Sequence, residues 1–199
     1  MNNEQQQNAQ ERRLRRVLVI IDAQNDFCHK DGALSSERCA AVGDKLAEYI
    51  RREGRRYDRV IMTRDTHYQN YLDTKEGSKL PVPHCIFNTW GVNFREDIFS
   101  AVTETFSMNR ISIIEKPTFM SLNWGNSDFG NESIDICGFA TDICVINNAL
   151  ILNALSPHPV SVISNLCAGT TPENERAALE IMQVNQIEVV DAIEPAIEK

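Results

Sequence analysis

Residues 133–152 read SIDICGFATDICVINNALIL and carry the clearest structural pattern in the chain. The first part is a short apolar run rich in β-branched residues and ended by Gly138, which is typical of a buried strand. Thr141 and Asp142 are both suitable N-cap residues, and the apolar side chains after them recur at helical spacing. The stretch therefore predicts a buried strand that leads directly into a helix.

Cys144 falls in the first turn of that predicted helix. At this place the free backbone N–H groups and the positive end of the helix dipole favour a thiolate over a thiol. The same N–H groups can hold an oxyanion. Most cysteines, however, are small buried hydrophobic residues. On this stretch alone, a catalytic nucleophile and a packing residue are both open interpretations of Cys144.

The rest of the chain repeats the alternation of strand and helix. Apolar runs rich in β-branched residues predict strands at 17–21, 57–63, 111–114, 133–137, 160–164 and 187–190. Helical spacing predicts helices at 37–53, at 94–107 and from 171 onward, the last with Pro172 at its first position. Such alternation predicts an α/β fold with a mostly parallel sheet.

Length and composition indicate one globular domain. The chain has 199 residues, of which 42% are hydrophobic and 24% charged, and this balance suits a single sizeable core. We assign the domain to residues 15–199. Residues 1–14 begin with a run of Asn, Gln and Glu that cannot bury apolar surface, so we interpret them as a disordered polar tail.

Charge and hydropathy exclude several classes of partner. A net charge of −8 and a pI of about 5.0 argue against nucleic acid and anionic membrane surfaces. No apolar run is long enough to cross a bilayer, and residues 17–21 are too short for the core of a signal peptide. We therefore expect a cytoplasmic protein whose six cysteines are free thiols.

Polar side chains stand at the ends of the first four predicted strands: Asp22, Asp65, Lys116 and Cys144. Because the carboxyl ends of parallel strands meet at one edge of a sheet, we expect these side chains to converge. Cys144 would be the nucleophile, and Lys116 would lower the pKa of its thiol from the usual ~8.5. Asp22 would take the thiol proton and return it to the leaving group.

A second group of polar residues points to a metal. The second strand runs into Asp65 and His67, and a long connection at 68–93 carries His84. One carboxylate and two imidazoles with open positions suit Zn²⁺, Fe²⁺ or Mn²⁺. A bare Asp-x-His is more often a surface carboxylate beside loop histidines. Its place beside the expected nucleophile favours the metal site, and long loops in compact domains are usually functional.

With these motifs the sequence resembles the isochorismatase-like cysteine hydrolases, and within them the nicotinamidase-type amidases, over roughly residues 17–190. The matching motifs are DAQNDF at 22–27, KPTF at 116–119 and, most specifically, GFATDICV at 138–145. The resemblance implies a three-layer α/β/α, Rossmann-like fold with a six-stranded parallel sheet. It also implies homo-oligomers, which are frequent in the family.

The same resemblance implies roles for single residues. By the match, Asp22 is the catalytic base and the peptide between Phe139 and Ala140 is cis. The backbone N–H groups of Ala140 and Cys144 would form the oxyanion hole. The metal ligands would be Asp65, His67 and His84, joined in some members by Glu76. Zinc is the favoured ion, with iron and manganese as alternatives, and it would bind the pyridine nitrogen of the substrate.

One position departs from the family pattern. Nicotinamidases often carry Trp or Phe three residues before the second metal histidine, where this sequence has Pro81. We take Phe27, which matches a substrate-packing aromatic of the family, and Phe119 as the substrate-binding residues. Two further aromatic residues, Trp90 and Trp124, are alternatives, and so is a substrate other than nicotinamide.

The implied activity is hydrolysis of a small carboxamide, most simply nicotinamide to nicotinate and ammonia, through a thioester on Cys144. One alternative is a related amidase acting on a ureido, carbamoyl or other non-pyridine amide. The metal ligands count against it. A second alternative is a catalytically silent binding module on the same fold, and the intact set of Asp22, Lys116 and Cys144 counts against that.

Overall fold

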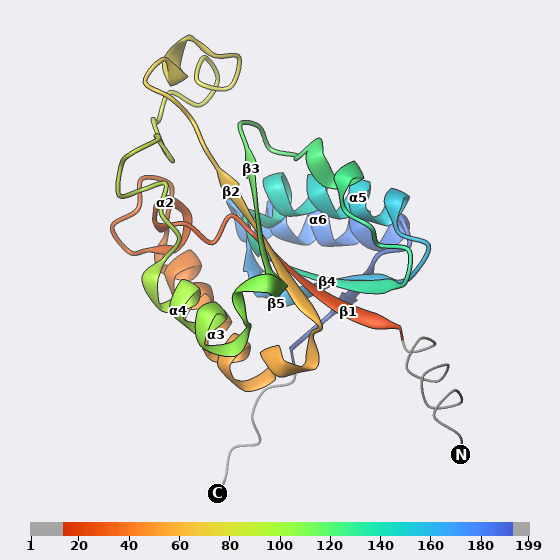
Figure 1. Ribbon diagram of the computed structural model, residues 1–199. Helices are drawn as coiled ribbons and strands as arrows, with labels where there is room; N and C mark the ends of the chain where they lie inside the picture. Colours follow the sequence, from red (N-terminus) through yellow and green to blue (C-terminus); the bar gives the residue numbers. More distant parts are fainter. Residues whose placement is uncertain (1–13, 193–199) are drawn as a thin grey trace, which may run out of the picture.

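A computed structural model describes residues 14–192, arranged as Figure 1 shows. Within these residues one six-stranded sheet forms in the order β3-β2-β1-β4-β5-β6, with every neighbouring pair parallel. The strands are β1 (Arg15–Ile21), β2 (Arg59–Asp65), β3 (Ile111–Lys116), β4 (Glu132–Phe139), β5 (Val160–Ala168) and β6 (Glu188–Val190). The predicted α/β fold with a parallel sheet is therefore confirmed.

Helices cover both faces of this sheet. In Figure 1, α3 and α4 lie on one side of the strands and α5 and α6 on the other, which gives the expected three layers. The helices are α2 (Asn25–Cys28), α3 (Glu37–Glu53), α4 (Glu96–Thr105), α5 (Ile146–Leu155) and α6 (Pro172–Val184). Short turns are η1 (Gly54–Arg56), η2 (Tyr71–Asp73), η3 (Met108–Arg110), η4 (Asn123–Asn126) and the π-helical η5 (Thr141–Val145).

The direction of the chain across the sheet reverses between β1 and β4. From β1 the chain moves outward through β2 to β3, and from β4 it moves outward the other way through β5 to β6. In open α/β sheets, a crevice forms beyond the carboxyl ends of the strands at such a reversal, and ligands bind there. The topology thus places a binding crevice beyond Ile21 and Phe139, the last residues of β1 and β4.

Burial explains why the central strands read as continuous apolar runs. Residues 17–21 of β1 are all 0% exposed, because β1 has a neighbour on each side and helices over both faces. Two predicted helix starts are also confirmed. The Ser36 side chain caps α3 by accepting a hydrogen bond from the Cys39 N–H. The Thr171 side chain caps α6 by accepting a hydrogen bond from the Asn174 N–H, and Pro172 lies in the first turn of that helix.

The helix after Gly138 begins later than the sequence suggests. Residues 141–145 form the π-helical turn η5, and α5 starts only at Ile146. Neither Thr141 nor Asp142 acts as an N-cap, so that expectation is wrong. Their side chains instead bind at the start of α6, where Thr141 contacts Glu175 and Asp142 accepts hydrogen bonds from Thr170.

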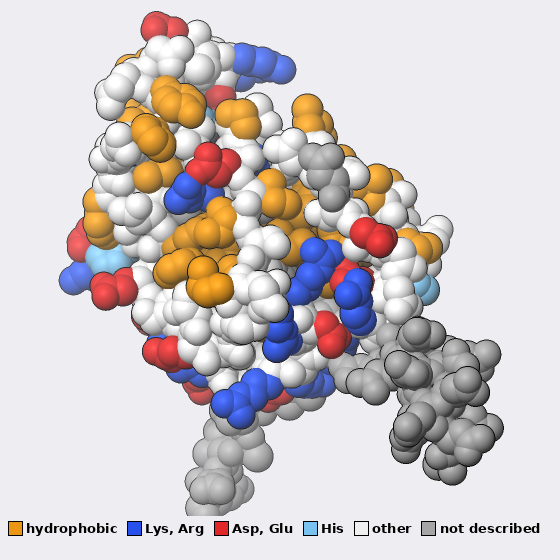
Figure 2. All heavy atoms as spheres, viewed as in Figure 1, with side chains coloured by type: hydrophobic (Ala, Val, Ile, Leu, Met, Phe, Trp, Pro, Cys, Tyr) orange, Lys and Arg blue, Asp and Glu red, His pale blue; other side chains and the backbone are white. Residues whose placement is uncertain are grey.

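The long connection between β2 and α4 projects from the body of the protein beyond the end of β2 (Figure 1). Hydrophobic side chains gather over it and over the centre of the same face (Figure 2). Its large exposed apolar residues are Tyr68, Leu72, Phe87 and Trp90.

Within residues 14–192, none of the helices is long and apolar enough to cross a bilayer. The tail assigned to residues 1–14 lies outside the described residues except for Leu14.

Gly138 is required where β4 passes β1. Its φ is +123°, and a Cβ atom built on it would lie 2.1 Å from the carbonyl oxygen of Ile21. We expect Gly138→Ala to lower the free energy of unfolding by about 2 kcal/mol or more, because both the backbone conformation and the space exclude a side chain. Gly125→Ala is the control, since a Cβ there meets nothing within 4 Å. Urea denaturation of both variants measures the difference, and equal losses would contradict this account.

Candidate active site

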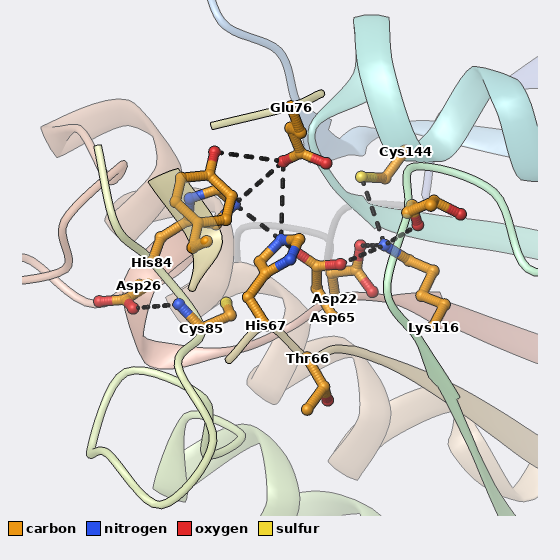
Figure 3. A network of polar contacts seen from close by, with 12 residues as sticks. Asp22, Asp26, Asp65, Thr66, His67, Glu76, His84, Cys85, Lys116 and Cys144 are labelled. Carbon is orange, nitrogen blue, oxygen red and sulfur yellow. Dashed lines mark hydrogen bonds and ion pairs between the residues drawn. The ribbon is translucent and has the colours of Figure 1, made fainter. Parts of the chain in front are cut away.

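The structure brings together the four strand-end residues that the sequence singled out (Figure 3). Asp22 follows β1, Asp65 ends β2, Lys116 ends β3, and Cys144 lies in η5 just after β4. All four are buried. The strands that carry them are neighbours in the sheet, so their carboxyl ends form one edge of the crevice.

The ammonium group of Lys116 is the centre of this cluster. Its Nζ lies 2.7 Å from Asp22 Oδ2, 3.2 Å from Asp65 Oδ1 and 3.6 Å from Cys144 Sγ. Nζ also donates to the carbonyl oxygen of Thr118 at 3.1 Å. Burial lowers the pKa of Lys116, but Asp22, Cys144 and Asp65 outweigh that effect and raise it well above its usual value. The lysine is therefore a fixed cation inside the site.

Asp22 is held so that one of its oxygens faces the lysine. Asp22 has a φ of +48°, a conformation that Asp tolerates better than most residues. The Thr63 hydroxyl donates to Asp22 Oδ1 at 2.6 Å and accepts from the Asp22 N–H at 3.0 Å, which leaves Oδ2 facing Lys116. Burial raises the pKa of Asp22, Lys116 opposes this and Asp65 adds to it. A carboxylate with a raised pKa is a better proton acceptor near neutral pH.

The thiol of Cys144 behaves differently from the sequence-based expectation. We expected Lys116 and the helix terminus to lower its pKa. In the structure, burial raises the pKa of Cys144 well above its usual value, and Asp22 and Asp65 raise it further. These effects together outweigh Lys116, which lowers the pKa. Burial and the two carboxylates therefore favour the protonated sulfur, so a cysteine nucleophile here would need a nearby group such as Asp22 to take its proton.

Asp65, His67 and His84 form a second cluster beside the first. Asp65 Oδ2 lies 3.0 Å from His67 Nε2 and 3.5 Å from His84 Nε2, and their potential ligand atoms all lie within 4.8 Å of one another. His84 reaches His67 because the chain returns beside it: the His67 N–H donates to Cys85 O, and the Phe87 N–H donates to His67 O. The long connection therefore completes the cluster.

This donor set fits a transition metal. His67 Nε2 is buried and makes no hydrogen bond, although Asp65 is close to it. His84 Nδ1 lies 2.9 Å from the Val82 carbonyl oxygen, which can only accept, so its Nε2 is free to act as a ligand. Two imidazoles and one carboxylate with a remaining open position are the pattern of catalytic zinc sites. Glu76 lies at the edge, with Oε1 at 3.6 Å from Nε2 of both histidines.

Gln24 fixes the backbone of Asp65, and sequence reasoning missed it. Its Oε1 accepts from the Asp65 N–H at 2.7 Å, and its Nε2 donates to Asp65 O and to Val92 O, each at 2.8 Å. Gln24 is 0% exposed. Thr63 was missed as well, although it stands two residues before Asp65 in β2 and so faces the same side of the sheet. Asp26 has a structural role: its carboxylate accepts a hydrogen bond from the Cys85 N–H at 2.7 Å and so holds the long connection that carries His84.

A cavity of about 660 Å³ opens beside the donor cluster and beside the chain neighbours of Lys116 and Cys144. Its walls are His67, Thr74, Lys75, Glu76, Lys79, Leu80, Pro117, Thr118, Phe119 and Ile143. Ile143 precedes the cysteine, so the cavity lies next to the expected nucleophile. A second cleft of about 710 Å³ is lined by Trp90 and, among others, residues of α3 and α4, and it contains none of the predicted catalytic or metal-binding residues.

The cavity separates the candidate aromatic residues. Phe119 lines it, whereas Phe27 is not part of the lining and packs edge-on against the donor residue His84, with ring centroids 5.5 Å apart. Trp124 is 0% exposed, and Trp90 faces the other cleft, so these two alternatives are wrong. Pro81 is exposed and does not line the cavity, so it does not take the place of the aromatic side chain that nicotinamidases often carry at this position. The expected cis peptide between Phe139 and Ala140 is present. The oxyanion role of the Ala140 and Cys144 N–H groups stays a prediction.

Comparison with known proteins agrees with this geometry. Residues 16–194 match the family model described as the isochorismatase domain. The chain belongs to the isochorismatase family. Among its relatives in this family, the nicotinamidase/pyrazinamidase of Mycobacterium tuberculosis is 29% identical over 188 residues, which cover 88% of this chain and 98% of that protein. The nicotinamidase of Schizosaccharomyces pombe is 24% identical over an alignment 213 residues long, and the alignment covers 92% of this chain and 96% of that protein.

Solved structures show the same isochorismatase-family fold. The nicotinamidase/pyrazinamidase PncA of Bacillus subtilis superposes with a TM-score of 0.75 at 20% identity, covering 89% of this chain and all of that one (100%). The pyrazinamidase of Pyrococcus horikoshii, solved in complex with zinc, gives a TM-score of 0.68 at 26% identity, covering 89% of this chain and 99% of that one.

The donor cluster generates a prediction about metal content. We expect the purified protein to carry about one transition-metal ion per chain, since two histidines and a carboxylate suffice for a tight site. His67→Ala removes a ligand and should abolish that content, whereas His158→Ala, a change at a half-buried histidine outside the site, should not. Mass spectrometry of the metals, with circular dichroism as the folding control, decides. A His67→Ala protein with full metal content would contradict this assignment.

Proposed function

We propose that this chain is a cysteine amidohydrolase that converts a small carboxamide, with nicotinamide favoured, to the carboxylate and ammonia. The observation that carries the proposal is the buried Lys116 ammonium, which contacts Asp22, Asp65 and Cys144 together beside the cavity. This arrangement joins a nucleophile and a base to a cluster of metal donors. The nicotinamidases among the relatives support the favoured substrate.

The first half of the reaction forms a thioester. Asp22 takes the proton of the Cys144 thiol as Sγ attacks the amide carbonyl. During this step the negative charge moves from Asp22 to the sulfur. The Lys116 ammonium offsets that charge throughout and need not move, because it already contacts both groups. The backbone N–H groups of Ala140 and Cys144 would receive the carbonyl oxygen of the tetrahedral intermediate. Asp22 then returns its proton to the amide nitrogen, the C–N bond breaks and ammonia leaves.

The second half hydrolyses the thioester. With ammonia gone, Asp22 can take a proton from a water molecule, which attacks the acyl carbon. The C–S bond breaks, the proton passes from Asp22 to the sulfur, and the product acid loses its remaining proton to solvent and leaves through the cavity as the carboxylate. The raised pKa of Asp22 serves both halves, since the same group must accept a proton and then give it back.

Substrate orientation would come from the donor cluster and the cavity walls. A metal ion held by Asp65, His67 and His84, with zinc favoured over iron or manganese and Glu76 as a further ligand, would offer an open position to a ring nitrogen. Leu80, Phe119 and Ile143 line the cavity, so an aromatic ring entering it would meet apolar surface, while Phe27 packs on the donor residue His84. These residues favour an aromatic amide that carries a ligand atom.

A non-pyridine amide is the second candidate, because the cavity of about 660 Å³ falls within the range of drug-sized ligand sites. A catalytically silent binding module is disfavoured by the close contacts of Lys116 with Asp22 and Cys144. Homo-oligomer formation, a cytoplasmic location and the absence of nucleic-acid and membrane partners remain predictions from the sequence.

The cysteine mechanism predicts a large effect of a small change. Cys144→Ala should lower kcat by on the order of 10³-fold or more while leaving the fold intact, because loss of a nucleophile removes the covalent route. Cys39→Ala is the matched control, since Cys39 is also buried but lies at the start of α3, outside the site. Ammonia release from nicotinamide measures turnover. Near wild-type activity in Cys144→Ala would exclude this mechanism.

The substrate prediction compares two amides that differ in one ring atom. Nicotinamide carries a pyridine nitrogen and benzamide does not. If the donor cluster orients the ring, kcat/KM for nicotinamide should exceed that for benzamide by about tenfold or more, since about 1.4 kcal/mol of differential binding suffices.

Pyrazinamide, which keeps the corresponding ring nitrogen, serves as the positive control in the same assay. Equal rates for nicotinamide and benzamide would remove the donor cluster from substrate recognition. Absence of turnover for all three amides in folded, metal-loaded protein would shift the assignment to a non-pyridine amide.

A further inference from the structure

The loop that follows Lys116, residues 117–124, contributes to two parts of the site at once. Its Pro117, Thr118 and Phe119 form one wall of the cavity. The Thr118 carbonyl oxygen accepts a hydrogen bond from Lys116 Nζ at 3.1 Å. Most of this loop is irregular, with only a short 3₁₀ turn at its end. The position of the cavity wall therefore depends on what anchors the loop to the rest of the protein.

Asn148 is that anchor. It lies on α5, one helical turn after Cys144, and is 0% exposed. Its Nδ2 donates to the carbonyl oxygens of Cys144 at 2.7 Å and Phe119 at 2.9 Å. Its Oδ1 accepts from the Ser121 N–H at 3.0 Å and from Trp124 Nε1 at 2.8 Å. Both donors and both lone pairs of the amide are thus used.

Asn148 is also the single polar link between this loop and α5 within the described residues. The three hydrogen bonds that join the two segments all end on its side chain. Other side-chain bonds of the loop are internal, such as Thr118 Oγ1 to Met120 O and the Asn123 N–H to Ser121 Oγ. One buried amide therefore ties the cavity wall directly to the carbonyl of the cysteine.

We propose that Asn148 is a positioning residue that sets the distance between the Phe119 wall and the Cys144 nucleophile, and thereby the fit of the ring of the substrate. The proposal rests on the proposed amidase function for its kinetic consequence. A displacement of about 1 Å in a substrate-positioning group can cost up to 10²-fold in rate. If the loop loses its polar link to α5 through Asn148, it can shift by such an amount while the sheet and helices remain folded.

The neighbouring Asn147 provides a matched control. Its Nδ2 donates to the Ile143 carbonyl at 2.8 Å, one turn earlier in the chain, just as Asn148 donates to Cys144. Within the described residues, however, Asn147 makes no side-chain hydrogen bond to residues 117–124. Replacing either residue by Leu removes one such bond within the helical turn, but only Asn148→Leu frees the loop.

The kinetic experiment is a double-mutant cycle with Phe119→Ala. We expect Asn148→Leu to lower kcat/KM for nicotinamide about tenfold, and Asn147→Leu to leave it within about twofold. If Asn148 acts through Phe119, then Phe119→Ala should cost activity in the wild-type and Asn147→Leu backgrounds but little in Asn148→Leu. An equal cost of Phe119→Ala in all three backgrounds would overturn the proposal, because a purely stabilising role of Asn148 gives additive effects.

A spectroscopic readout tests the anchor without any substrate. The chain has two tryptophans, of which Trp90 is 49% exposed and Trp124 is 0% exposed. In a Trp90→Phe background, Trp124 fluorescence should be quenched by acrylamide more strongly after Asn148→Leu, and equally before and after Asn147→Leu. Unchanged quenching in Asn148→Leu would overturn the proposal.

The two readouts separate this proposal from the proposed function. If the wild-type protein hydrolyses no amide, the function fails while quenching still reports whether Asn148 holds the loop. If amides are hydrolysed and the cycle is additive, the function stands and the positioning role fails. Should Asn148→Leu not fold, Asn148→Ser, which is smaller and leaves room for water, takes its place in both experiments with the same expected outcomes.

Discussion

The burial of one ammonium group is the constraint on which the rest of this site depends. Lys116 has lost its water, and a buried charge is tolerated only when opposite charges and acceptors replace that water. Asp22 and Asp65 supply the charge, and the Thr118 carbonyl and the Cys144 sulfur complete the surroundings. The catalytic and donor clusters are therefore parts of one electrostatic unit.

Neutral polar side chains hold this unit in place. Thr63 fixes Asp22, Gln24 fixes Asp65, and Asn148 ties the turn of Cys144 to the loop after Lys116. Each of these side chains is 0% exposed, and each is bonded directly to a charged or reacting residue or to its backbone. Neutral groups can orient charges without adding to their number, which matters because two carboxylates already share one lysine. In this part of the protein, the charged groups contact one another, and the neutral side chains bind and orient them.

The sequence predicted the α/β class, the strands that carry the site and the convergence of Asp22, Asp65, Lys116 and Cys144. Those predictions rest on local periodicity and on the rule that parallel strands share an edge, so they need no tertiary detail. The neutral positioning residues escaped prediction because an isolated Thr, Gln or Asn carries no distinctive spacing. Asn148 was nonetheless within reach, since a residue four positions after Cys144 lies on the same helical face.

The pKa of the cysteine could not be predicted from the sequence in the same way. A helix start and a lysine both favour a thiolate, but the balance depends on how deeply the sulfur is buried and how near the carboxylates are. Burial is a property of the whole fold, and here it outweighs Lys116. Likewise, Thr141 and Asp142 suit an N-cap by type, but the start of α6 lies close enough to bind them instead.

The pairing of β1 with β4 has a consequence for how the molecule reaches its working form. These strands lead into Asp22 and Cys144, the proposed base and nucleophile, and they come from opposite halves of the chain: the Cys137 thiol donates to the Val19 carbonyl oxygen across 118 residues. Contacts of such long range form late, because the entropy of closing the loop is lost before the contact stabilises anything. No fragment that ends before β4 can hold a complete crevice. The crevice is therefore complete only once the two halves of the chain have met.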